Sequence, residues 1–150
     1  MTPWNEKNNF ALLKKSGTTK TVILHSHMDT VGIEDYGLLK TIANDPDTLI
    51  DFFKDYDNDP VVQEHAKSDD WLFGRGILDM KSGDAVNIAT LFYYMEHMDE
   101  LSCNLLVVTN CVEENDHTGA IQVSSELLRL RKAGYDFKVA INTDFISPSY

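Results

Sequence analysis

The segment CNLLVVTN (residues 103–110) is a continuous apolar run of strand length, and segments with helical periodicity stand on both sides of it. A strand that is buried on both faces of a sheet has this character, without the polar alternation of a half-exposed strand. Helices before and after such a strand predict an α/β fold, in which helices cover both faces of a mixed sheet. We expect the chain to build its core around this strand.

Two long helices are predicted on either side of it. The first spans residues 83–97, and its apolar face consists of Ala85, Ile88, Ala89, Phe92 and Met95. Its other side is also fairly apolar, so we expect it to be sandwiched between layers. The second spans residues 118–132, with a stripe formed by Ala120, Val123, Leu127 and Leu130. Gly134 is well placed to end this second helix.

Further strands are predicted near both ends of the chain, and an excursion between them. Residues 10–14 and 21–25 are interpreted as a hairpin joined by the turn SGTT, residues 71–76 as a brief strand, and residues 137–144 as another buried strand. Between residues 37 and 68 the chain is acidic, and Asp45-Pro46 and Asp59-Pro60 each predict a helix start. We expect two short helices there, on an exposed excursion.

Composition argues against two classes of partner. The formal net charge is -11, from 24 acidic and 13 basic residues. Nucleic acids and anionic membranes bind clustered Lys and Arg residues, so neither is expected as a partner. Cys103 and Cys111 form no CxxC pair and are interpreted as packed thiols. The first ten residues lack the features of a signal peptide and no apolar run reaches the length of a membrane span, so a cytoplasmic location is expected.

Each predicted strand that leads into the core is followed by side chains that bind metals or protons. In chain order these are His25, His27, Asp29, Asp79, Glu113, Glu114 and Asp144. Ligands of α/β sheets bind at the carboxyl ends of the strands, so these side chains are expected to share one site. Imidazole and carboxylate groups without thiolate are ligands of zinc, or of manganese or cobalt. The pattern predicts a pair of divalent ions, at which one residue of the Glu-Glu pair binds metal while the other takes a proton from the activated water.

Four ordered motifs carry a resemblance to a known family. HMDTV (27–31), GRGILDMKSGDA (74–85), VEENDHTGA (112–120) and INTD (141–144) resemble the metal-site motifs of the co-catalytic zinc metallopeptidases of clan MH. This clan contains the aminoacylase, carboxypeptidase, peptidase T and dipeptidase group, and its arginine-utilisation branch is the most similar. The resemblance implies that residues 1–150 are part of a zinc-peptidase catalytic domain of the phosphorylase/hydrolase-like fold, without its lid domain and its C-terminal portion.

The resemblance also implies roles for six residues. Four metal ligands are carried over, namely His27, Asp79, Glu114 and Asp144. Asp79 would bridge the two ions, while Glu114 would bind the second ion together with a histidine from the later part of the domain. Glu113 would be the general base, and Asp29 would orient His27 through its other ring nitrogen. A cis peptide bond is expected between Asp79 and Met80.

Other polar residues have structural interpretations that compete with functional ones. His25 would share the strand face of His27, and a buried structural histidine is favoured over a ligand. His117 could supply a ligand, but a solvated residue at a helix start is favoured. Arg75 and Lys81 could bind substrate, although ion pairs with nearby acids are favoured. Asp79 also has an alternative interpretation as the N-cap of the helix after it.

The expected function is the hydrolysis of a small amide by a metal-activated water. The substrate would be a dipeptide, an N-acyl amino acid or an arginine-related compound, and two zinc ions (or manganese or cobalt) are expected in the complete protein. The resemblance further implies a homodimer formed through the lid domain. The alternative is a non-catalytic or single-metal remnant that keeps the fold as a scaffold.

Overall fold

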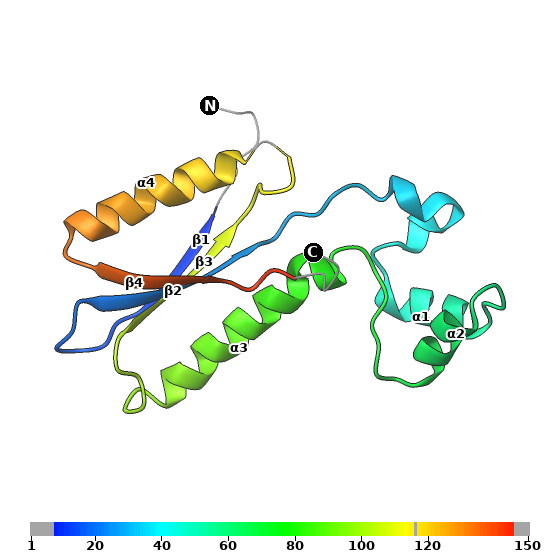
Figure 1. Ribbon diagram of the computed structural model, residues 1–150, viewed down its shortest axis with the longest axis horizontal. Coiled ribbons are helices and arrows are strands. Elements are labelled where there is room, and N and C mark those ends of the chain that lie inside the picture. Colours follow the sequence, from blue (N-terminus) through cyan, green and yellow to red (C-terminus); the bar gives the residue numbers. More distant parts are fainter. Residues whose placement is uncertain (1–7, 116, 146–150) are drawn as a thin grey trace. The chain divides into compact units, whose positions relative to one another are not determined.

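A computed structural model describes residues 8–115 and 117–145 (Figure 1). The chain divides into two compact units. One unit contains residues up to 30 and from 79 onward, and we call it the sheet unit because all the strands lie in it. The other is Val31–Leu78, which contains the predicted excursion and is called the excursion unit.

The sheet unit is built on a four-stranded mixed sheet. Its strands are β1 (Asn9–Leu13), β2 (Lys20–His27), β3 (Asn104–Asn110) and β4 (Asp136–Asn142), in the spatial order β1-β3-β2-β4. β2 pairs in parallel with both β3 and β4, whereas β1 pairs antiparallel with β3. The carboxyl ends of β2, β3 and β4 therefore meet at one edge of the sheet.

Two long helices cover opposite faces of this sheet, α3 (Ser82–Glu96) and α4 (Thr118–Lys132) (Figure 1). Side chains alternate along a strand, so β2 and β3 each contribute to two cores. On the α4 side the buried cluster is Ile23, Leu106, Val108, Val123 and Leu130. On the α3 side it is Leu24, Leu101, Leu105 and Val107, with Leu91 and Tyr94 of α3 packed against it. The predicted α/β fold with helices on both faces is confirmed.

The predicted hairpin of the first two strands is wrong. β1 and β2 are adjacent in sequence, but β3 lies between them in the sheet and pairs with both. The apolar run of β3 gains more from a central position, where both of its faces are covered, than β1 would. A second strand prediction is also wrong, because residues 71–76 form turns and irregular structure.

β4 is present but is not the buried strand that was predicted. Val139 and Ile141 are 47% and 46% exposed, and β4 forms an edge of the sheet, where it pairs only with β2 among the described strands. The prediction that α3 is sandwiched between two layers is also wrong. Of its apolar face, Ile88, Phe92 and Met95 are exposed.

A glycine in each of the two long helices allows that helix to lie close to the sheet. α3 approaches at Gly83, where a Cβ atom would lie 2.4 Å from the carbonyl oxygen of Thr143. α4 approaches at Gly119, where a Cβ atom would lie 1.7 Å from Oδ1 of Asn110. Ala120 of the predicted α4 stripe is consequently exposed, while its other members face the sheet. As predicted, α4 ends before Gly134, which has a φ of +101°.

The excursion unit contains a 3₁₀ segment, η1 (Glu34–Ile42), and the two predicted short helices, α1 (Pro46–Lys54) and α2 (Pro60–Lys67). Asp45 and Asp59 are the N-caps, as predicted, and accept hydrogen bonds from the first backbone N–H groups of their helices. The Thr48 hydroxyl group holds the pKa of Asp45 below its ordinary value. None of the helices formed by the described residues has both the length and the apolar character that crossing a membrane requires.

Candidate metal centre

His27 is the last residue of β2, and its side chain is 3% exposed at the edge where the parallel strands end. Its Nε2 lies 3.1 Å from Oδ1 of Asp79 and 3.7 Å from Oδ2 of Asp144. Asp79 comes from the segment before α3, and Asp144 directly follows β4. One ligand atom from each of the three residues lies within 4.8 Å of the other two. Three of the four predicted ligands therefore converge.

This group fits a divalent ion by its donor chemistry and spacing. Zinc bound by nitrogen and oxygen at about 2.0–2.2 Å in tetrahedral geometry places its ligand atoms about 3.3–3.6 Å apart. The two separations from His27 Nε2, 3.1 and 3.7 Å, fall close to that range. Two carboxylates beside one buried imidazole also concentrate negative charge that a divalent cation would neutralise.

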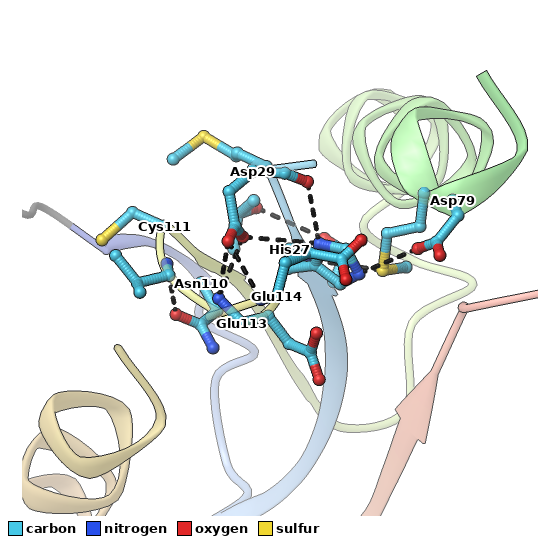
Figure 2. A network of polar contacts seen from close by, with 12 residues as sticks. His27, Asp29, Asp79, Asn110, Cys111, Glu113 and Glu114 are labelled. Carbon is cyan, nitrogen blue, oxygen red and sulfur yellow. Dashed lines mark hydrogen bonds and ion pairs between the residues drawn. The ribbon is translucent and has the colours of Figure 1, made fainter. Parts of the chain in front are cut away.

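Asp29 contacts both the His27 ring and the turn after β3 (Figure 2). Nδ1 of His27 lies 3.1 Å from the backbone oxygen of Asp29 and 3.5 Å from its carboxylate. The same carboxylate accepts hydrogen bonds from the backbone N–H groups of Glu113, at 3.0 and 2.9 Å, and of Glu114, at 3.0 Å. Asp29 thus has a second contact, with the backbone of the Glu-Glu pair, that was not expected from the sequence.

The parallel pairing of β2 and β3 explains this contact. His27 pairs with Asn110, so the residues that follow both strands emerge at the same edge of the sheet. Glu113 and Glu114 are half-buried there. Glu114 lies outside the three-residue ligand group that the described residues form, and its assignment to a second ion stays a prediction.

Two residues next to Asp79, Met80 and Lys81, also contact the segment around His27, which was not expected from the sequence. Met80 is fully buried, and its sulfur accepts a hydrogen bond from the backbone N–H of His27. Lys81 donates to the carbonyl of Met28 at 3.0 Å, and the predicted ion pair of Lys81 with an acid is not formed among the described residues. The peptide bond between Asp79 and Met80 is cis, as predicted. Asp79 is not the N-cap of α3, since that position is Lys81.

The remaining candidates lie outside the ligand group. His25 is half-buried within β2, and its backbone carbonyl accepts from Thr143. His117 is exposed at the start of α4, as predicted, with Nδ1 3.9 Å from Oε1 of Glu113. Arg75 forms the predicted ion pair with an acid, Asp35. Cys111 is half-buried.

Asp29 is expected to hold the Glu113–Glu114 backbone in place, and amide hydrogen exchange can test this. A hydrogen bond to a charged group contributes about 1.5–3 kcal/mol, so Asp29→Ala should speed exchange of the Glu113 and Glu114 amides about 10- to 100-fold. Asp29→Asn keeps one acceptor oxygen and should give a smaller increase. The buried amide of Leu106 in β3 serves as the control and should be unchanged. Unchanged exchange at Glu113 and Glu114 would rule out this role.

The fold and the site define an α/β domain that gathers histidine and carboxylate side chains where its parallel strands end. No family model matches the sequence. The chain is 47% identical over 150 residues to Protein RocB of Bacillus subtilis (strain 168), in an alignment that covers 99% of this chain and 26% of RocB. It is 37% identical over 134 residues to the uncharacterized protein YqjN of the same organism, covering 87% of this chain and 24% of YqjN.

The chain thus spans about a quarter of the length of the curated relatives that it matches. Identity at this level over nearly the whole chain supports a RocB-like family.

Proposed function

We propose that this chain is the metal-binding part of a metal-dependent hydrolase that cleaves an amide bond in a small substrate. The observation that carries the proposal is the convergence of the His27 imidazole with the carboxylates of Asp79 and Asp144. The motif resemblance to the zinc metallopeptidases of clan MH supports the same reaction class. The similarity to RocB is compatible with it.

His27, Asp79 and Asp144 would hold one ion, and Glu114 would belong to a second. A bound divalent ion would supply Lewis-acid chemistry to the amide carbonyl. Glu113 would take a proton from the attacking water as the water oxygen bonds to the carbonyl carbon. The protonated Glu113 would then give this proton to the amine nitrogen as the carbon–nitrogen bond breaks. Asp29 would keep Glu113 in place by accepting a hydrogen bond from the backbone N–H of Glu113.

The substrate class is part of the proposal. A dipeptide, an N-acyl amino acid or an arginine-related compound fits the motif resemblance. The negative charge of the chain favours a neutral or cationic substrate over a polyanion. The exclusion of nucleic acid and membrane partners, and a homodimer formed through a lid domain, stay predictions.

A second candidate function is a single-metal scaffold without catalysis. The position of Glu114 favours it, because the described part of the chain contains one group of three converging ligands and Glu114 lies outside that group.

Zinc titration of the complete protein, with metal analysis after purification, distinguishes these functions. Two bound ions and hydrolysis of a compound from a panel of dipeptides and N-acyl amino acids are expected for the hydrolase, because the later part of the domain would supply the remaining ligand of the second ion. One bound ion without hydrolysis would support the scaffold. Failure to bind zinc, manganese or cobalt would contradict both functions for this chain.

A further inference from the structure

The excursion unit contains a cavity of about 460 Å³ that lies outside the metal centre. This volume is within the range of about 300–1,000 Å³ that is typical of small-molecule sites. All the residues around it lie between positions 35 and 75, so the cavity belongs to the excursion unit alone. Five of them are aromatic, namely Tyr36, Phe52, Phe53, Tyr56 and Phe73.

The aromatic walls are held by contacts among the rings themselves. The Phe53 ring lies 5.0 Å from that of Phe73 and meets Tyr56 edge to face at 5.5 Å. Phe52 meets Phe53 edge to face at 5.3 Å. Rings packed in this way are preorganised, so a ligand would not have to order them. The faces of aromatic rings carry negative electrostatic potential and attract cations.

A cation from the chain itself already lies against this cavity. The guanidinium carbon of Arg75 is 5.2 Å from the centre of the Tyr36 ring. Its Nη2 donates to both carboxylate oxygens of Asp35. These hydrogen bonds hold the pKa of Asp35 below its ordinary value, so the group stays ionised. The Tyr36 ring and the Asp35 carboxylate together therefore accommodate a planar cation.

The charge of the excursion unit favours the same class of ligand. Residues 31–78 include eleven acidic and four basic residues, a net charge of -7 out of -11 for the whole chain. A surface with this excess of negative charge raises the local concentration of cations and repels anions. Asp35 is 65% exposed in its side chain, so a ligand from solvent can reach its carboxylate.

We propose that the cavity of the excursion unit binds an organic cation with a planar or apolar body. The cationic group pairs with Asp35, and the body packs against the rings of Phe53 and Phe73. Amidinium and guanidinium compounds are the ligand class that fits, because the guanidinium of Arg75 already pairs with Asp35 and lies over the Tyr36 ring. The ligand pairs with Asp35 alongside Arg75, or it displaces Arg75 from Asp35. This site does not depend on metal binding or on amide hydrolysis.

Three probes of nearly equal size and different charge test the proposal by calorimetric titration. They are benzamidine, a cation, benzamide, which is neutral, and benzoate, an anion. Benzamidine is expected to bind with a Kd of about 10 mM or below, as ligand efficiency predicts for nine non-hydrogen atoms. It should bind about tenfold more tightly than benzamide, because only the cation gains the ion pair and the cation–π contacts. Equal or tighter binding of benzoate, or no binding of benzamidine, would overturn the proposal.

Substitutions then locate the binding. Asp35→Asn should weaken benzamidine binding about tenfold by removing the ion pair. Arg75→Gln should strengthen it, because Asp35 loses its internal partner. Asp70→Asn, which changes an exposed carboxylate elsewhere in the unit, is the control and should leave the affinity unchanged. Far-UV circular dichroism confirms that each variant is folded. Unchanged affinity in both Asp35→Asn and Arg75→Gln would show that benzamidine binds elsewhere.

Discussion

His27→Ala is expected to abolish tight zinc binding by the chain. The imidazole would provide the one nitrogen ligand of the three-residue group, and its Nε2 lies within 3.7 Å of both carboxylates. Removing it leaves two carboxylates, which are weak zinc ligands without a nitrogen donor. Loss of an outer residue that only orients a ligand costs about 10–100-fold in metal affinity, so loss of the ligand itself should cost more than about 100-fold. Competition with a chromophoric chelator measures the change.

His25→Ala is the matched control for this substitution. It removes the same side chain from the same strand, two residues earlier and outside the ligand group. Its zinc affinity should stay near that of the unmodified chain. Thermal unfolding gives a second readout, because a ligand that binds only the folded state raises the Tm. Added zinc should raise the Tm of His25→Ala and leave that of His27→Ala unchanged. A reversed result would assign the ligand to His25.

The convergence of His27, Asp79 and Asp144 could be predicted from sequence. It depends mainly on where the strands end, and less on the order of the strands in the sheet. His27 and Asp144 follow apolar runs that become the parallel neighbours β2 and β4. Parallel neighbours bring their carboxyl ends together whatever lies beyond them. Three of the four predicted ligands therefore converge even though β4 is an exposed edge strand and β1 pairs with β3.

Features that depend on close contacts could not be predicted in the same way. The orientation of α3 follows from Gly83, which approaches the carbonyl of Thr143, and a count of apolar residues gives no sign of that contact. The preference of β1 for β3 depends on the competition between strands for the central position. The bonds from Asp29 to the backbone of Glu113 and Glu114 depend on the register of β2 with β3, which hydrophobic patterns do not specify.

Glu113→Gln is expected to remove amide hydrolysis while zinc affinity stays unchanged. Glutamine has the shape of glutamate but cannot take a proton from water, and general acid–base catalysis contributes about 10²–10⁴-fold to a rate. The kcat for a substrate found in the panel above should fall by about that factor. His117→Ala is the control, because this imidazole is 3.9 Å from the Glu113 carboxylate and has no role in the proposed reaction. His117→Ala should keep most of the activity. A normal rate in Glu113→Gln would exclude Glu113 as the base, and a large loss of zinc from that variant would make Glu113 a ligand instead.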